Sequence, residues 1–249
     1  MAEQSLIEWT DSTWNPWHGC VKVSPGCKNC YMYRGKERWG KNPRNVVRSR
    51  TTFDDPLRWT TPRRIFTCSW SDWFIEDADP WREEAWQVVR QSPHHTFQIL
   101  TKRPERILGA LPQDWGTGWP NVWVGVSIET QQFIHRKETL QSIPSSLRFI
   151  SAEPLLGPIE FGELKGIHWV ITGGESGPKA RPMDPAWARS IRKQCAASKV
   201  TFFHKQNGGT RIVDGAWGGR TLDSRTWDSI PRRNVSLIQR THLRVLGDA

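Results

Sequence analysis

The stretch that decides the fold is residues 96–128, TFQILTKRPERILGALPQDWGTGWPNVWVGVSI. It begins with an apolar run of strand length at 96–101 and ends with a second such run at 122–128. Between the two runs, Pro104 begins a segment that we expect to be helical over 104–110. A strand, a helix and a strand in this order indicate a βαβ unit, in which both strands run parallel in one sheet.

The same alternation continues on both sides of this stretch. Further strands are expected at 6–9, 64–70, 148–153, 168–174 and 200–205, and further helices at 80–91, 131–142 and 184–198. Two of these helices have a start signal, because Asp79 and Asp184 each precede a proline at the first helical position and can cap the helix. The rhythm predicts an α/β fold, namely a TIM-like (β/α) barrel or partial barrel with parallel strands.

Composition limits the organisation and the partners of the chain. The barrel is expected over residues 1–206, and a Gly- and Arg-rich extension at 207–249 is expected to form loops and a hairpin that pack on the barrel or trail from it. The 249 residues include 35 Lys and Arg against 25 Asp and Glu, a net charge of +10 that favours a nucleic acid or nucleotide-like partner. The chain has no apolar run of membrane-spanning length and no signal-peptide pattern, so we expect a cytoplasmic protein without membrane contact.

Three of the five cysteines form the motif C-x6-C-x2-C, at Cys20, Cys27 and Cys30. An odd number of cysteines in a reducing compartment disfavours a disulfide framework and favours metal binding. One interpretation is a structural zinc site that His18 completes, in a non-catalytic nucleic-acid-binding protein. A second is an iron–sulfur cluster in which one iron has no protein ligand, and a third is three ordinary buried thiols.

Chemistry-bearing residues follow nearly every expected strand, where parallel α/β folds collect their reactive groups. These strand-end residues are Cys68, Ser69, Asp72, Thr101, Lys102, Arg103, Ser127, Glu129, Ser151, Glu153, Gly173, Gly174, Glu175, Lys205 and Gln206. We expect Lys102, Arg103 and Lys205 to bind anionic groups of a substrate, with Asp72 at the same rim. Glu153 can hold a ribose hydroxyl or pair with Lys102 or Lys205. A hydrolase or lyase using the rim carboxylates is a further alternative, for which no acid/base pair stands out.

Aromatic and basic residues suggest two further roles. Residues 31–50, YMYRGKERWGKNPRNVVRSR, interleave cations with aromatic rings, a pattern that suits alternating phosphate contact and base stacking, although a solvated basic connection has the same composition. Trp9, Trp14 and Trp17 precede the cysteines, and we expect them to pack around the cysteine segment. Cys68 is expected to be a small core residue or a strand-end thiol that donates a hydrogen atom.

Motifs spread over residues 7–232 resemble one known family. They are IEWTDSTWNPWHGCVKVSPGCKNCY (7–31), CSWSDWF (68–74), FQILTKRPERI (97–107), VWVGVSIET (122–130), RFISAEPLLGPI (148–159), WVITGGESGPKARPM (169–183), TFFHKQNGG (201–209) and GRTLDSRTWDSIPR (219–232). Together they resemble a phage-associated three-cysteine-motif family of unknown function (DUF5131-type), which is grouped with the radical S-adenosylmethionine TIM-barrel enzymes. Those enzymes usually space their cysteines C-x3-C-x2-C, so the first gap here is longer.

The resemblance implies a radical S-adenosylmethionine-like enzyme that acts on nucleic acid or a nucleotide-like substrate. It implies a [4Fe–4S] cluster on Cys20, Cys27 and Cys30, with S-adenosylmethionine on the fourth iron. An electron donor would reduce the cluster, and a 5′-deoxyadenosyl radical would result.

The resemblance also implies contacts to that cofactor. In the radical enzymes a Gly-Gly-Glu stretch meets the amino group of S-adenosylmethionine, which points here to Gly173, Gly174 and Glu175. Glu153 is a further candidate for the cofactor. Tyr31 directly follows the last cysteine, where its ring can shield a cluster from water or simply pack in the core.

Overall fold

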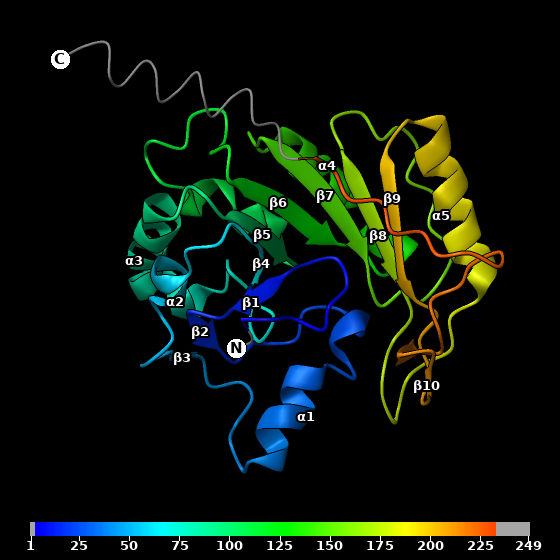
Figure 1. Ribbon diagram of the computed structural model, residues 1–249, viewed down its shortest axis with the longest axis horizontal. Coiled ribbons are helices and arrows are strands. Elements are labelled where there is room, and N and C mark those ends of the chain that lie inside the picture. Colours follow the sequence, from blue (N-terminus) through cyan, green and yellow to red (C-terminus); the bar gives the residue numbers. More distant parts are fainter. Residues whose placement is uncertain (1–2, 233–249) are drawn as a thin grey trace.

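The computed structural model describes residues 3–232 and contains a seven-stranded sheet that curls into a half-barrel (Figure 1). In sheet order the strands are β1 (Ser12–Trp14), β4 (Arg64–Thr67), β5 (Thr96–Thr101), β6 (Val122–Ser127), β7 (Leu147–Ala152), β8 (Trp169–Gly173) and β9 (Thr201–Gln206). Every neighbouring pair is parallel. The sheet ends at β1 on one side and at β9 on the other, so the predicted partial barrel with parallel strands is confirmed.

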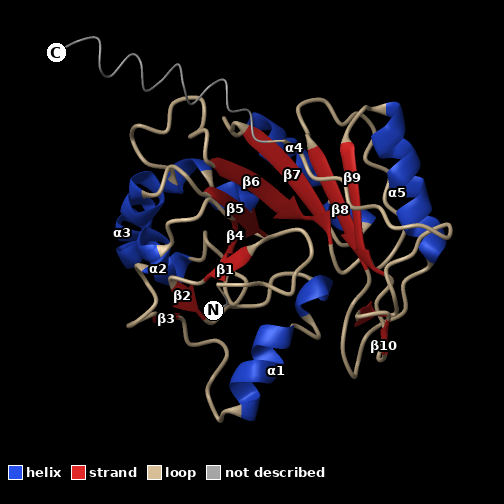
Figure 2. Ribbon diagram, viewed as in Figure 1, coloured by secondary structure: helices blue, strands red, loops and turns tan. Residues whose placement is uncertain are grey.

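Helices cover the convex face of the sheet (Figure 2). They are α3 (Asp79–Gln91), α4 (His135–Ser142) and α5 (Pro185–Ala197). Their apolar side chains, such as Trp86, Leu140 and Ile191, share one core with the outward-facing residues of the strands. As predicted, Asp184 caps α5, because its carboxylate accepts a hydrogen bond from the Ala186 amide at 2.8 Å. These helices carry the chain from the end of one strand back to the start of the next, and so keep the strands parallel.

Short elements fill the connections. They are the antiparallel pair β2 (Trp17–His18) and β3 (Val47–Arg48), the helices α1 (Tyr31–Arg38) and α2 (Asp55–Arg58), the 3-10 helices η1 (Pro25–Cys27), η2 (Glu76–Ala78), η3 (Pro104–Arg106), η4 (Leu108–Ala110) and η5 (Gln131–Phe133), and the hairpin of β10 (Ile212–Val213) and β11 (Ala216–Trp217). The sequence did not lead us to expect β2, β3, α1 or α2. Both β2 and α1 flank the three cysteines, so this part of the fold bears directly on the site.

Three expectations about elements were wrong. The segment 6–9 forms a turn, in which the Thr10 amide donates to the Ile7 carbonyl, and the strand begins only at Ser12. The expected helix 104–110 is divided into η3 and η4, because Gly109 and the following Pro112 leave too little chain for an α-helix. Asp79 is the first residue of α3 rather than its cap, and its carboxylate pairs with Arg82 and Arg106.

The concave face carries a second, aromatic core. Its members are Trp9, Phe66, Trp123, Leu147, Phe149, Trp169, Ile171 and Phe203, which we call the aromatic floor. The Trp9 and Phe66 ring centroids lie 4.6 Å apart. Trp9 therefore does not pack around the cysteine segment as expected, and Trp14 and Trp17 contact Trp73 in the main core. Since side chains alternate along a strand, Phe149 of the floor shares its face with Ser151 and Glu153, and the concave face becomes polar towards the carboxyl ends of the strands.

After β9 ends at residue 206, the chain forms a hairpin and then runs back alongside β9. The β10–β11 hairpin agrees with the hairpin expected in the extension. The His204 amide then donates to the Trp227 carbonyl, and the Trp169 indole donates to the Ser229 carbonyl at 3.0 Å, so residues up to 229 pack on the sheet. Residues 233–249 of the expected extension lie outside the described residues. Within residues 3–232, no helix combines the length and the apolar character needed to cross a membrane.

Candidate metal centre at the carboxyl edge of the sheet

Residues 19–30, here called the cysteine loop, leave β2 and enter α1. Pro25 begins the 3-10 turn η1, in which the Cys27 amide donates to the Ser24 carbonyl at 2.9 Å. Cys30 is the residue before α1, and its carbonyl accepts the Arg34 amide of the first helical turn at 3.3 Å. The turn and the start of α1 thereby fix the main-chain conformation at Cys27 and at Cys30. All three thiols of the loop are free and partly exposed.

Residues after β4, β5 and β6 hold the cysteine loop at the carboxyl edge of the sheet. Arg103, after β5, donates to the Val21 carbonyl at 2.8 Å and lies 3.8 Å from the Cys20 sulfur. The Ser24 hydroxyl donates to Glu129 Oε1, after β6, at 2.6 Å. After β4, the Ser71 hydroxyl donates to the Gly19 carbonyl at 2.5 Å. The loop is therefore anchored by several strands rather than by its own backbone alone.

A second set of contacts joins the end of the cysteine loop to the segment after β8. Asn29 donates to Glu175 Oε2 at 2.9 Å and to the Lys179 carbonyl at 2.8 Å. Arg34 of α1 reaches the Ser176 carbonyl at 3.3 Å. Since β4 and β8 lie on opposite sides of the central strands, the loop spans most of the carboxyl edge.

Asp72 and Arg103, two expected substrate-binding residues, bind each other. Their ion pair measures 3.1 Å and is nearly buried, and Asp72 also accepts the Thr101 hydroxyl at 2.6 Å and the Lys102 amide at 2.9 Å. Burial lowers the pKa of Arg103, but the charge of Asp72, the neighbouring Cys20 and the hydrogen bonds to both together outweigh this effect and leave the pKa raised. Burial and the Asp72 charge raise the pKa of Cys20 to about 12. The pair thus fixes the first cysteine, and a metal bound there would have to displace the thiol proton.

Glu129 is the centre of a buried charge cluster beside Cys27. Its side chain is fully buried and lies 3.1 Å from both Lys102 Nζ and Arg136 Nη1. Burial alone would raise the pKa of Glu129, but Lys102, the Ser24 hydroxyl and Arg136 hold it below its usual value. Burial lowers the pKa of Lys102, whereas the charges of Glu129 and Cys27 more than compensate and leave it raised. Lys102 thus lies within electrostatic reach of the second cysteine.

The Gly173–Gly174–Glu175 segment lies at the carboxyl end of β8. The Glu175 carboxylate accepts from Arg181 Nη2 at 2.6 Å and from Arg181 Nε at 2.9 Å. Burial tends to raise the pKa of Glu175, but hydrogen bonds from Arg181 and Asn29 lower it. A Cβ on Gly174 would lie 2.1 Å from the Asn207 carbonyl oxygen, so only glycine permits this close approach of the chain after β9.

Glu153 and Lys205 form a separate pair on the concave face, at 3.3 Å. This is one of the two pairings expected for Glu153. The Ser151 hydroxyl also donates to Glu153 at 3.2 Å. Tyr31, which follows the cysteine loop, donates its hydroxyl to the Ser69 carbonyl. The residue as a whole is 44% exposed, but its hydroxyl end is shielded from solvent, and this desolvation together with the charges of Cys30 and Glu153 raises its pKa.

Two other candidates, Cys68 and His18, remain to be placed. Cys68 is buried in the main core, and burial together with the charge of Asp72 raises the pKa of its thiol well above the usual value. His18 lines a pocket with Lys36, Trp39 and Lys41, which contains none of the three cysteines. Among residues 3–232, no group of three or more His, Cys, Asp or Glu side chains converges in a way that could hold a metal ion.

The chemistry of the donor set fits the iron–sulfur group that the resemblance implies, although the three thiols do not converge on one point within residues 3–232. Three free thiols of the cysteine loop provide the soft ligands of such a cluster, and one iron would remain without a protein ligand. Arg103 beside Cys20 and Lys102 near Cys27 supply positive charge towards the thiolates. Cys20, Cys27 and Cys30 are therefore the residues that would hold the group.

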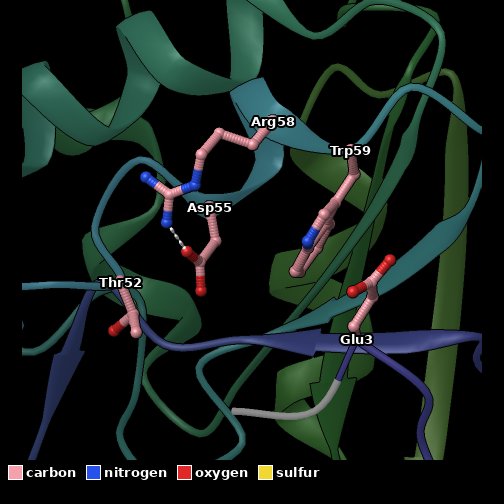
Figure 3. Close-up of a pocket in the computed structure, with 5 residues that line it drawn as sticks. All are labelled: Glu3, Thr52, Asp55, Arg58 and Trp59. Atoms are coloured by element: carbon pink, nitrogen blue, oxygen red, sulfur yellow. Dashed lines mark hydrogen bonds and ion pairs between the residues drawn. The ribbon is translucent and has the colours of Figure 1, made fainter.

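One pocket lies away from the cysteine loop. It has a volume of about 460 Å³ and is lined by Glu3, Thr52, Asp55, Arg58 and Trp59 (Figure 3). Glu3 bonds Arg63, the residue before β4, which places this pocket near the amino ends of the strands. A second pocket of about 340 Å³ lies against β2 and α1, and we call it the basic pocket; its charged and aromatic lining residues are His18, Lys36, Trp39, Lys41, Arg50 and Trp70.

Fold and site together define an α/β half-barrel protein with a three-cysteine loop docked on the carboxyl edge of its sheet. Residues 4–231 match DUF5131, a family described as a protein of unknown function, and the chain belongs to this family. No curated protein and no solved structure matches the chain.

The sequence reasoning missed several residues of this site. Arg136 and Arg181 complete the ion pairs of Glu129 and Glu175, and Asn29 ties the cysteine loop to β8. Their only signal is position: Asn29 lies within the cysteine motif, and Arg181 follows the Gly-Gly-Glu segment by six residues. No local pattern identifies Arg136, which approaches Glu129 because η5 and α4 turn the chain back.

Proposed function

We propose that this protein is a radical S-adenosylmethionine-like iron–sulfur enzyme that acts on nucleic acid or a nucleotide-like substrate. One observation carries the proposal: three free, partly exposed thiols lie in a single loop that strand-end residues hold over a half-barrel. Cys20, Cys27 and Cys30 would hold a [4Fe–4S] cluster. When bound, the cluster and S-adenosylmethionine supply a 5′-deoxyadenosyl radical for hydrogen abstraction.

The residues around the loop have complementary tasks in this proposal. Lys102 and Arg103 stabilise negative charge at the cysteines, since both lie within electrostatic reach of a thiol. Glu153 offers a carboxylate to a ribose hydroxyl, and Lys205 offers a cation to an anionic group of cofactor or substrate. Glu175 would share its carboxylate between Arg181 and the cofactor ammonium.

Exclusion of water is the other requirement of radical chemistry, and the fold provides two barriers. The aromatic floor closes the concave face below the polar edge. Tyr31 lies at the cysteine loop with its hydroxyl tied to the Ser69 carbonyl, which restrains the ring next to Cys30. A bound substrate and an external electron donor complete the proposed system.

Metal analysis after anaerobic purification and reconstitution tests the proposal. We expect about four iron and four sulfide per chain, and a loss of both in Cys20→Ala, Cys27→Ala and Cys30→Ala. Cys195→Ala is the matched control, because Cys195 lies in α5 and should leave the iron content unchanged. Thermal unfolding of each variant verifies that it folds.

Turnover is the second step of the test. With dithionite as reductant, the reconstituted protein should convert S-adenosylmethionine to 5′-deoxyadenosine, and Cys27→Ala should not. One tightly bound zinc per chain with no iron after reconstitution would instead support the structural zinc site and overturn the proposal.

A further inference from the structure

The basic pocket is a second candidate binding site, outside the carboxyl edge. Its volume is about 340 Å³. The lining residues come from four separate segments: His18 from β2, Lys36 and Trp39 from α1 and its end, Arg50 from the chain after β3, and Trp70, which forms one wall, from the loop after β4. The pocket is thus assembled by tertiary structure and not by one exposed loop.

The cations of the basic pocket have no acidic residue beside them in its lining: of residues 3–232, no Asp or Glu lines the pocket. Lys36 donates to the main-chain carbonyls of His18 and Asn45, at 3.2 and 2.9 Å, so its charge is held without being neutralised. Burial and the charge of Lys41 lower the pKa of Lys36, as expected for a cation beside another cation. Such a pocket attracts an anion.

Two exposed indole rings accompany these cations. Trp39 is 75% exposed and Trp70 is 36% exposed, and in the described part of the chain neither ring contacts another aromatic ring. Trp70 lies against α1 at Gly35, where a Cβ would come within 2.7 Å of the indole. A glycine inside a helix costs stability, and here it makes room for the ring. The Trp70 amide also donates to Asn15 Oδ1 at 2.7 Å, which fixes the main chain of this wall.

The pocket at Glu3 and Trp59 differs from the basic pocket in its charge balance and in the exposure of its tryptophan. Its single cation, Arg58, forms an ion pair with Asp55, and Glu3 adds a second carboxylate to the lining (Figure 3). Its tryptophan, Trp59, is only 9% exposed. An anionic ligand with an aromatic ring would therefore prefer the basic pocket.

We propose that the basic pocket binds an unpaired nucleotide of a single-stranded nucleic acid, with its base stacked on the indole of Trp39, the more exposed of the two rings, and its phosphate at Lys41 and Arg50. A base in a duplex has both faces covered by its neighbours, so only an unpaired base can use the exposed indole faces. The combination of cations and stacking rings distinguishes this ligand from an acidic peptide, which would not need the rings.

The position of the pocket connects it to the cysteine loop. Gly19, the first residue of that loop, donates its amide to the Trp70 carbonyl at 3.0 Å, and Lys36 holds the neighbouring His18 carbonyl. A strand bound in the pocket would therefore run next to the cysteine loop. Binding needs no cluster, so this inference stands or falls separately from the proposed enzymatic activity.

Fluorescence anisotropy with a labelled oligothymidine of about twelve nucleotides tests the inference, using the full-length chain before and after cluster reconstitution. We expect binding at about 20 mM salt that weakens as salt increases. Trp39→Leu should bind about 5- to 150-fold more weakly, as expected for one lost stacked base. Trp39→Phe should retain most of the affinity, because it keeps a ring. Lys41→Gln and Arg50→Gln should each reduce the slope of log K against log salt by about 0.7.

Lys165→Gln is the matched charge control, because Lys165 is exposed in the loop before β8 and should leave the slope unchanged. Melting curves establish that every variant is folded. Equal binding by Trp39→Leu and the unaltered chain, equal or tighter binding of a duplex of the same length, or full competition by polyglutamate would each overturn the inference. Oligothymidine binding without any 5′-deoxyadenosine formation would support it and would count against the proposed enzymatic activity alone.

Discussion

Cations occur in two contrasting settings in this molecule. At the carboxyl edge of the sheet, Lys102, Arg103 and Arg181 each lie within 3.1 Å of a carboxylate oxygen. In the basic pocket, Lys41 and Arg50 have no carboxylate at ion-pair distance among the residues described. The two settings are adjacent. The cysteine loop begins at Gly19, beside the basic pocket, and its Asn29 contacts Glu175 at the carboxyl edge.

The difference shows what each set of cations is able to do. A buried cation that is paired with a carboxylate fixes chain segments, and its removal leaves the partner charge uncompensated. An unpaired cation at the surface contributes little to stability and remains available to a ligand. The contrast predicts that mutations at the edge mainly change folding, and that mutations in the basic pocket mainly change binding.

Glu129→Gln should have the largest effect. It leaves Lys102 and Arg136 buried without a negative partner, so we expect a loss of about 3–5 kcal/mol in the free energy of unfolding. Urea unfolding measures this change. Glu138→Gln is the control, because Glu138 is exposed on α4, and it should change stability by less than about 0.5 kcal/mol. Similar stability of the two variants would contradict the structural role of the edge cluster.

Asp72→Asn should follow with a loss of about 2–3 kcal/mol, because the amide cannot replace the charge that Arg103 faces and presents an N–H group to donors. The cysteine loop should also loosen, since Arg103 holds the Val21 carbonyl and approaches Cys20. Faster labelling of Cys20 by a thiol reagent measures this second effect. Asp77→Asn, an exposed carboxylate in η2, serves as control, and equal labelling rates would argue against the anchoring of the loop.

Much of the edge could be predicted from the sequence because one rule applies to every strand. Apolar runs placed β5, β6, β7, β8 and β9 to within one or two residues, and parallel strands must end at the same edge. Residues such as Glu153 and Lys205 were therefore expected to lie together, and they do. The rule predicts proximity, but it does not predict which charge pairs with which.

The elements that the sequence did not predict have no local signal. The strand β1 consists of only three residues, and it is a strand because Ser12, Thr13 and Trp14 pair with Ile65, Phe66 and Thr67 of β4. The helix α1 contains Gly35 and several charges, and its contacts with the loops after β4 and β8 position it. Tertiary contacts of this kind override propensity, so the sequence indicated the cations and rings of residues 31–50 but not the pocket that they form with His18 and Trp70.

His95 sharpens the comparison, because it is fully buried and has no carboxylate at ion-pair distance within residues 3–232. Burial of the imidazole, and to a smaller extent the charge of the neighbouring His94, lowers the pKa of His95 to about 4. The hydrogen bond between Nε2 and the Pro56 carbonyl opposes this shift without cancelling it. The unfolded chain, with a pKa near 6.5, binds the proton more readily, so stability is full above about pH 6.5 and decreases as the pH falls towards 4. We expect His95 to account for about 2 kcal/mol of the loss between about pH 7 and pH 5.

His95→Gln tests this pH dependence, because the glutamine amide can still donate to the Pro56 carbonyl but does not titrate. Urea unfolding at both pH values should show a smaller acid loss in this variant than in the unaltered chain. His135→Gln, at an exposed position of α4, should leave the acid loss unchanged. An identical pH dependence of the two variants would mean that His95 is not the group responsible.

Lys41→Gln should have the smallest effect on stability. Lys41 has no ion-pair partner among the residues described, and its charge opposes that of Lys36, so we expect a change of less than about 0.5 kcal/mol. The change should be slightly stabilising at about 20 mM salt and should vanish at higher salt, because screening removes the repulsion. Urea unfolding at two salt concentrations measures it. A loss above about 1 kcal/mol would mean that Lys41 supports the fold, as Lys102 does, and would remove the distinction between the two sets of cations.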